Sequence, residues 1–226
     1  MRALALLLSL AVAGFATEAR AQPADTGITL GARLGYGIPM GDAAKPGGQS
    51  FALKDYVSGQ VPIEIEAGYR FTREISAGLY FGYGFAFASS KVCDQFGPLP
   101  TGVSCSASGA SVMRYGIQAA YRFIMPGMTP WLGLGIGMEQ AKLDVKASGF
   151  GASQTSKFEV SGWEYLNLQG GVDWDLSPGL KVGPFARVSI AKYDTAKLDG
   201  TKQDLPSSDQ SIHEWLTIGV KGTFDL

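Results

Sequence analysis

The chain lacks long apolar runs, an excess of charge of either sign, and the residues from which metal sites are usually built. After an apolar stretch at residues 3–16, no segment approaches the ~20 consecutive apolar residues that a membrane-spanning helix requires. Charged residues make up 17% of the chain and sum to a net charge of −1, so no basic surface for nucleic acid is expected. One histidine and two cysteines are too few for a metal-ligand cluster. We therefore expect no metal, no cofactor and no nucleic-acid partner.

The N-terminus has the pattern of a secretory signal peptide. Met1 and Arg2 precede the apolar stretch, and Ala19-Arg20-Ala21 provides a small-residue cleavage site. We expect residues 1–21 to be removed and residues 22–226 to form one mature domain. Export to an oxidising compartment would allow Cys93 and Cys105 to form a disulfide.

An alternation of apolar side chains with glycine or polar ones runs through the rest of the chain, and it is clearest at residues 75–87. Successive side chains of a strand point to opposite faces, so one face of this segment is entirely apolar. That face carries Ile75, Ala77, Leu79, Phe81, Tyr83, Phe85 and Phe87. Such a row needs an apolar medium along roughly 20 Å, which a bilayer provides outside a barrel. A soluble, lipocalin-like carrier would instead hide the row inside.

Eight segments share this alternation, and their connections alternate between long and short. The predicted strands are residues 26–38, 59–71, 75–87, 112–124, 131–143, 163–176, 180–193 and 212–226. The long connections are 39–58, 88–111, 144–162 and 194–211, and the short ones are 72–74, 125–129 and 177–179. An open sheet edge cannot exist in hydrocarbon, so the sheet must close. We predict an all-β, closed, antiparallel, eight-stranded transmembrane up-and-down β-barrel, with a local bulge where Pro184 removes a backbone donor.

Aromatic residues lie near the ends of these segments, as in the girdles of membrane barrels. Next to the short connections or the C-terminus lie Phe71, Phe123, Trp131, Trp174 and Phe224, and near the long connections lie Phe85, Phe87, Trp163, Tyr193 and Trp215. The chain ends in Phe224-Asp-Leu226, with apolar residues at the last and third-last positions.

Over nearly its whole mature length the chain therefore resembles the eight-stranded outer-membrane β-barrels of the OmpA/OmpX type. The resemblance implies a monomer in the outer membrane of a Gram-negative bacterium, surrounded by outer-membrane lipid, with both termini in the periplasm. It also implies insertion by the barrel-insertion machinery through the C-terminal strand. The match is architectural, and a fold of this kind does not by itself fix a function.

If the apolar rows face lipid, the opposite rows line the lumen, which in an eight-stranded barrel is just wide enough for side chains to fill. Near mid-height these rows place a predicted charge network of Arg33, Glu64, Glu66, Glu139, Arg187 and Lys221. Three cations meet three carboxylates, and a buried charge is costly unless it is paired. We predict a salt-bridged plug. Inward glycines suit either an open cavity or close strand approach, so they do not decide whether water passes.

The residues favour a non-enzymatic outer-membrane protein that contributes to envelope structure or surface interaction through its long loops. The alternative is a narrow, charge-gated pore for ions or small hydrophilic solutes. A lipid-modifying enzyme would need a nucleophile and a base that converge. His213 has Ser211 on its own face of the strand and Glu214 on the other, so we predict a polar histidine at the barrel rim and no catalytic residue. The glycine-rich segment 133–137 lies within a strand and is not a nucleotide-binding loop.

Overall fold

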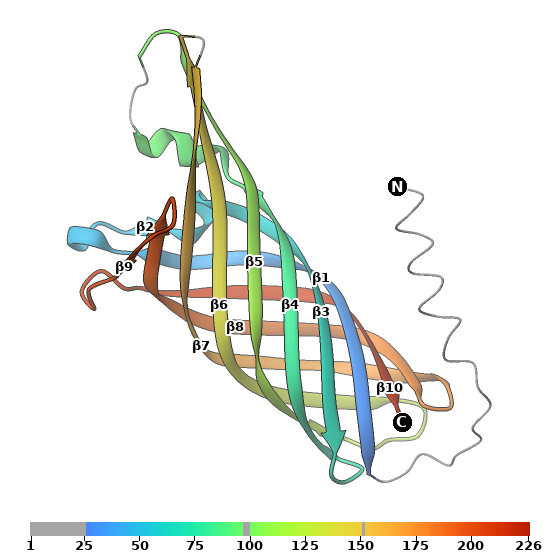
Figure 1. Cartoon of the computed structure of the whole chain (residues 1–226). Helices are drawn as coiled ribbons and strands as arrows, with labels where there is room; N and C mark the ends of the chain where they lie inside the picture. The colour runs from blue at the N-terminus through green and yellow to red at the C-terminus, as the bar shows by residue number, and fades with distance from the viewer. Residues whose placement is uncertain (1–25, 97–99, 151) are drawn as a thin grey trace.

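Eight long antiparallel strands form a closed barrel in the computed structural model, which describes residues 26–96, 100–150 and 152–226 (Figure 1). The strands are β1 (Gly27–Ala44), β3 (Val57–Arg70), β4 (Ile75–Ala88), β5 (Val103–Arg122), β6 (Thr129–Gly149), β7 (Ala152–Ser177), β8 (Leu180–Leu198) and β10 (Ile212–Asp225). Each pairs with the next, and β10 pairs with both β8 and β1, which closes the ring. The predicted fold and strand number are confirmed. The predicted signal peptide, residues 1–21, lies outside the described residues.

Two short strands and several 3-10 helices lie at one end of this ring. Strands β2 (Phe51–Ala52) and β9 (Thr201–Asp204) pair with β1 and β8. The described residues also form the 3-10 helices η1 (Pro46–Gly48), η2 (Leu53–Asp55) and η3 (Ser90–Phe96). Among the described residues, no helix is long and apolar enough to cross a membrane.

The two ends of the barrel differ, and we name them by their connections. The short-turn end carries the connections 71–74, 123–128 and 178–179 together with the first residue of β1 and the C-terminus. There the amide of Leu226 donates to the carbonyl of Ile28 at 2.9 Å, which fastens the C-terminus to β1. The long-loop end carries η1, η2, η3, β2, β9 and the tip between β6 and β7 (Figure 1).

The apolar rows face outward and the charged side chains face inward, as predicted. The outward positions include Leu34, Ile63, Leu79, Ile117, Leu134, Ile218 and Val220, which are all exposed. The inward positions include Arg33, Glu64, Arg114, Glu139, Arg187 and Lys221, which are all buried. The folded chain therefore has the predicted arrangement, with apolar side chains outside the barrel and charged side chains inside it.

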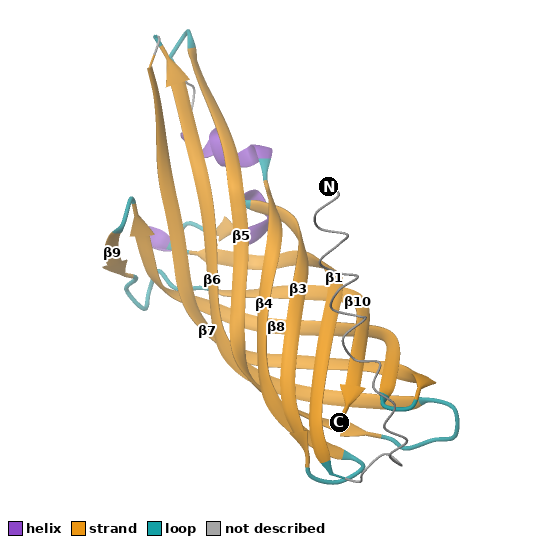
Figure 2. Cartoon of the chain, turned by 45° about the vertical axis from the view of Figure 1, so that its right-hand side comes forward, coloured by secondary structure: helices purple, strands orange, loops and turns teal. Residues whose placement is uncertain are grey.

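Strands β5, β6 and β7 continue far beyond the rest of the barrel at the long-loop end, where they form a protruding ribbon (Figure 2). The predicted long connections at 88–111 and 144–162 are therefore shorter than expected, because β5 begins at Val103 and β6 and β7 fill 129–149 and 152–177. The glycine, serine and lysine content of these segments suggested loops. Alternation nevertheless continues there, with Leu143 and Val145 buried and Lys146 exposed.

The bulge predicted at Pro184 is wrong. Pro184 lies opposite Val220 in an uninterrupted β8–β10 register. On the other side the β7–β8 register is the same at Gly171–Phe185 and at Trp174–Val182, and only the pairs between them are missing. Proline lacks a backbone donor but its φ fits an extended strand, so the ladder to β7 loses bonds locally without a change of register.

The predicted disulfide is confirmed. Cys93 of η3 and Cys105 of β5 are joined, with their Cα atoms 5.7 Å apart. The bond ties η3 to the outer part of the protruding ribbon, because Cys105 pairs with Ala147 close to the end of β6.

Candidate functional site in the barrel lumen

Arg33 of β1 lies at the centre of the ionic contacts in the short-turn half of the lumen. Strand register places it directly opposite Glu64 on β3 and Lys221 on β10. Its guanidinium nitrogens lie 2.6 Å from a carboxylate oxygen of Glu66 and 3.4 Å from one of Glu64. It also donates a hydrogen bond to the side-chain carbonyl of Gln169. One planar cation thus connects residues from β1, β3 and β7.

Two further cations complete this group, which we call the Arg33 cluster: Arg33, Glu64, Glu66, Arg187 and Lys221. Arg187 donates to Glu64 at 2.5 Å, and the ammonium of Lys221 lies 2.8 Å from Glu66. Gln118 donates to Glu66 at 2.5 Å and accepts from Gln169 at 2.9 Å, which joins β5 to the same contacts. Three cations face two carboxylates, so every carboxylate has two positive partners. A buried pair of this kind is costly to break, because the remaining charge cannot recruit water.

Aromatic rings cover the cations of the Arg33 cluster. The Arg33 guanidinium lies 5.5 Å from the Trp131 ring and 5.3 Å from the Phe185 ring, and the Lys221 ammonium lies 4.4 Å from Trp131. Trp131 in turn donates from its indole nitrogen to Asp173 at 3.1 Å. These distances permit cation–π attraction, which strengthens when water is excluded.

Glu139 of β6 organises a second group, nearer the long-loop end. Its carboxylate accepts from Arg114 at 2.7 Å, from the Tyr193 hydroxyl at 2.5 Å and from the Trp215 indole at 3.3 Å, and lies 2.9 Å from Nε2 of His213. We call these five residues the Glu139 cluster, and each is almost fully buried. The structure thus divides the six residues of the predicted charge network. Five of them form the Arg33 cluster, and the sixth, Glu139, belongs to a separate cluster.

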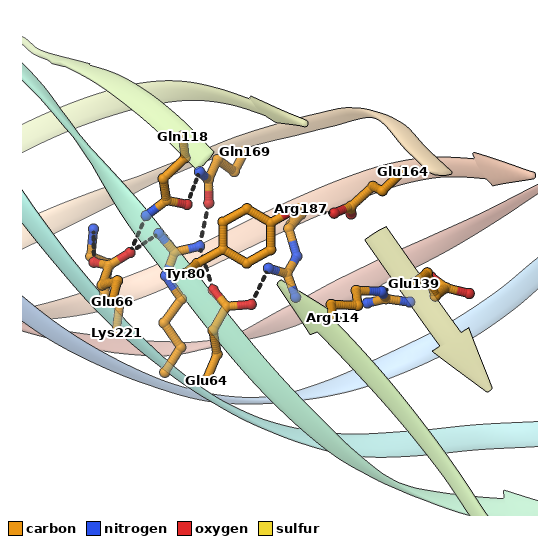
Figure 3. A network of polar contacts seen from close by, with 11 residues as sticks. Glu64, Glu66, Tyr80, Arg114, Gln118, Glu139, Glu164, Gln169, Arg187 and Lys221 are labelled. Atoms are coloured by element: carbon orange, nitrogen blue, oxygen red, sulfur yellow. Dashed lines mark hydrogen bonds and ion pairs between the residues drawn. The ribbon is translucent and has the colours of Figure 1, made fainter. Parts of the chain in front are cut away.

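Tyr80 occupies the lumen between the two clusters (Figure 3). Its hydroxyl donates to Glu164 of β7. The glycines opposite it make room for the ring, since a Cβ atom at Gly116 or Gly137 would collide with the Tyr80 hydroxyl. The space above these inward glycines is thus filled by a side chain from the neighbouring strand, since Tyr80 pairs with Gly116 and Gly116 pairs with Gly137.

A third ionic group closes the short-turn end. Asp225 accepts from Arg70 at 2.7 Å and from Lys181 at 2.9 Å, and it lies 3.6 Å from Arg122. Between this group and the Arg33 cluster, the cavity beside Thr29 and Lys221 measures about 30 Å³. That is room for one or two water molecules and not for a solute.

In the described part of the lumen, the hydrogen-bond partner of His213 is a carboxylate. His213 points its Nε2 at Glu139, while its neighbour Ser211 makes no hydrogen bond to it within the described residues. No group of three or more histidine, cysteine or acidic residues that could hold a metal ion occurs in the described part of the chain. The chemistry present is that of buried ion pairs and hydrogen bonds.

Comparison with known proteins places the chain among membrane barrels. Residues 4–216 match the family described as outer membrane protein beta-barrel domain. The chain belongs to this family. It is a protein of the bacterial outer membrane, and the outward apolar rows of its barrel face membrane lipid. No curated protein sequence matches the chain.

Solved outer-membrane barrels are similar to this chain at low sequence identity. Neisserial surface protein A is 14% identical, with a TM-score of 0.47 over 88% of this chain and 97% of that one. The attachment invasion locus protein Ail of Yersinia pestis is 16% identical, with a TM-score of 0.39 over 88% and 99%. The protease OmpT of Escherichia coli is 10% identical, with a TM-score of 0.39 over 91% and 98%. Membership of the outer membrane beta-barrel family defines the fold, and a fold does not decide whether a member is an enzyme.

Several lumen residues of this outer membrane beta-barrel were assigned wrongly from the sequence. Trp131, Tyr193 and Trp215 were predicted in the lipid-facing girdles, yet they are buried in the lumen, with Trp131 only 2% exposed. The histidine predicted at the polar rim, His213, is fully buried. Alternation alone would have corrected all four, because each lies an even number of residues from an inward charge on its own strand. Arg114 was missed, although it lies directly opposite Glu139 in the β5–β6 register.

Proposed function

We propose that this outer-membrane barrel is non-enzymatic and contributes to envelope structure or surface interaction through its long-loop end. The observation that carries the proposal is the filling of the lumen by the Arg33 and Glu139 clusters. Both clusters connect strands that are not neighbours in the ring, since Arg187 of β8 reaches Glu64 of β3 and His213 of β10 reaches Glu139 of β6. A barrel braced in this way suits a rigid platform better than a wide passage.

The long-loop end is the part that we expect to be used, and we place it on the cell exterior with both termini in the periplasm. Outer-membrane barrels keep short turns on the periplasmic side and longer connections outside. The ribbon of β5, β6 and β7 and the disulfide between Cys93 and Cys105 give this end a defined shape. A stiff projection loses little conformational entropy when it contacts a partner, which favours a role in recognition.

Planar-bilayer recording of the purified barrel tests whether the lumen is sealed. We expect no large, permanently open conductance. A large, permanently open conductance would contradict the proposal. A small conductance that changes when Arg187 is replaced would favour the alternative, a narrow charge-gated pore.

A shortened ribbon tests the role of the long-loop end. Residues 147–154 include the outermost β6–β7 pairs, so replacing them with Asn-Gly removes the tip and leaves the barrel intact. We expect cells carrying this variant to resemble a deletion strain in surface adherence or in sensitivity to detergent. The control replaces the turn at 125–128 with Asn-Gly at the short-turn end. If the tip variant behaved like the wild type in both assays while a deletion strain did not, the ribbon would have no such role.

A further inference from the structure

An apolar cavity lies at the long-loop end of the lumen, beyond the Glu139 cluster. Its volume is about 350 Å³. The walls come from strand ends and from two 3-10 helices that fold over the barrel mouth, and they include Leu53, Val92, Leu143, Val145, Phe158 and Val160. The residues around it form two buried apolar clusters, one centred on Trp215 and Tyr193 and one on Leu143 and Val145.

The apolar lining results from an inversion of the alternation along β6. From Leu132 to Ile136 the outward side chains are apolar and the inward ones are glycine. Beyond Glu139 the inward side chains Leu143 and Val145 are apolar and buried, while polar side chains take the outward positions. Lumens of outer-membrane barrels are usually polar. An apolar chamber therefore follows from the sequence of this chain and not from the fold alone.

The floor and the lid of the cavity are both fixed. Tyr193 forms part of the floor, and its hydroxyl is held by Glu139. Val92 forms part of the lid, and the next residue, Cys93, is bonded to Cys105 on β5. The chamber is thus supported by the polar cluster below and by a covalent bond above. Protein interiors are normally packed without voids of this size, so rigid walls are needed to keep it open.

The charge that borders the cavity is already balanced. Among the described residues that line it, only Lys142 is charged, and its ammonium lies 3.3 Å from the carboxylate of Glu159. The hydrogen bond from Lys197 and the contact with Lys142 lower the pKa of Glu159, although its partial burial acts in the opposite direction. The lowered pKa keeps the carboxylate charged. An ionised ligand would therefore find no free counter-charge on these walls.

We propose that this cavity binds a small, uncharged, apolar molecule of the size of a bicyclic aromatic or a medium-length hydrocarbon. Its volume falls in the range of about 300–1,000 Å³ that is typical of small-molecule sites. An apolar cavity of about 150 Å³ is already enough to hold benzene. The site lies on the long-loop side of both ionic clusters, so binding does not require passage through the lumen and does not depend on the function proposed above.

Methyl NMR on the full-length barrel in nanodiscs of deuterated lipid tests the proposal, with naphthalene as the probe. We expect saturable shifts at the methyl groups of Leu143, Val145 and Val160. The lipid-facing methyl groups of Leu79 and Leu134 should show only the linear drift caused by partition into the bilayer. Absence of saturation at the cavity methyls would overturn the proposal, as would saturation with equal affinity by 2-naphthoate, because a charged ligand should be excluded.

Matched variants assign the binding to the cavity. Val145→Trp fills the chamber, and Val220→Trp makes the same change on the lipid-facing surface of β10. We expect V145W to weaken naphthalene binding by at least about tenfold, as a misfit of one or two methylenes does in an apolar pocket, and V220W to leave it unchanged. Ala141→Leu replaces V145W if the latter does not show the folded band in unheated gel electrophoresis. Unchanged binding in the folded cavity variant would overturn the assignment.

Discussion

Tyr193 and His213 stack with their ring centroids 4.1 Å apart, and both hydrogen-bond the same carboxylate oxygen of Glu139. The two aromatic residues come from β8 and β10, while Glu139 comes from β6. This contact joins one side of the ring to the other at the level where the lumen changes from polar to apolar. The integrity of the cluster therefore affects both the barrel and the chamber above it.

Replacing Glu139 with alanine should destabilise the barrel strongly. The change leaves Arg114 buried without its counter-charge, and breaking a buried pair in this way costs about 3–5 kcal/mol of unfolding free energy. Urea unfolding in liposomes, followed by tryptophan fluorescence, measures the loss. The control is Glu159→Ala, whose carboxylate pairs with Lys142 and Lys197 near the surface, with an expected cost of about 0–1 kcal/mol. Equal losses for the two variants would contradict the distinct role of Glu139.

Replacing Arg187 with alanine should weaken the plug. Glu64 would then keep only the longer contact to Arg33, and the space left by the guanidinium would open the lumen to water. We expect either a new, small bilayer conductance or a loss of about 3–5 kcal/mol in unfolding free energy. Lys197→Ala, which removes a cation at the surface, serves as the control. If the Arg187 variant had wild-type stability and no conductance, Arg187 would contribute neither to the stability of the barrel nor to sealing the lumen.

An arginine on the lipid face should be tolerated poorly. Leu79 is 62% exposed on the outward face of β4, and a charge near the middle of the bilayer costs about 2–4 kcal/mol on the lipid face of a barrel. Leu79→Arg should lower the unfolding free energy in liposomes by this amount. Leu198→Arg makes the same change at an exposed position at the long-loop end of β8 and should cost close to nothing. The reverse order would place the bilayer elsewhere on the barrel.

Epitope insertion can determine which end of the barrel faces the exterior. Phe150 is 85% exposed at the tip between β6 and β7, and Gly127 lies in the turn between β5 and β6 at the short-turn end. A tag after Phe150 should bind antibody on intact cells, whereas a tag after Gly127 should bind only after the outer membrane is permeabilised. Surface binding by the Gly127 tag alone would reverse the orientation.

The disulfide should stabilise the lid of the chamber more than the barrel. Cys93 and Cys105 are 12 residues apart, and closing a loop of about this length is worth roughly 2–4 kcal/mol in the entropic treatment. Cys93→Ser together with Cys105→Ser should increase proteolysis within residues 89–102 while the folded band in gel electrophoresis remains. Alkylation of both thiols in the wild type without reductant would show that the bond does not form.

The strand count and the sidedness could be predicted because both follow from a period of two along the chain. The same alternation also predicts which aromatic side chains point into the lumen. Trp131, Tyr193 and Trp215 share a face with inward charges of their own strands, and the preference of aromatic residues for membrane interfaces obscured this. The ribbon was missed because composition was given more weight than the alternation of Lys142, Leu143, Asp144 and Val145.

Other features lay beyond the reach of sequence patterns. The division of the charges into two clusters depends on the stagger between strands, which brings Arg187 to Glu64 across 123 positions in the sequence. The apolar chamber depends on η2 and η3 folding over the barrel mouth, and neither 3-10 helix has a periodic signature. The register stays continuous at Pro184 although pairs to β7 are missing beside it, and the sequence alone did not indicate this.

The ribbon of β5, β6 and β7 is long enough to extend beyond the headgroup layer of the membrane. In β6, apolar side chains change from the outward to the inward face after Glu139. Residues 142–149 continue the strand beyond this point for about 23 Å, at ~3.3 Å for each residue. Even at a tilt of about 45° the tip would rise roughly 16 Å, whereas the headgroup layer on one side of a bilayer is only about 5–8 Å thick. The tip therefore stands clear of the lipid. With the long-loop end on the cell exterior, as proposed above, an antibody or another soluble macromolecule would touch the ribbon before it touched the membrane.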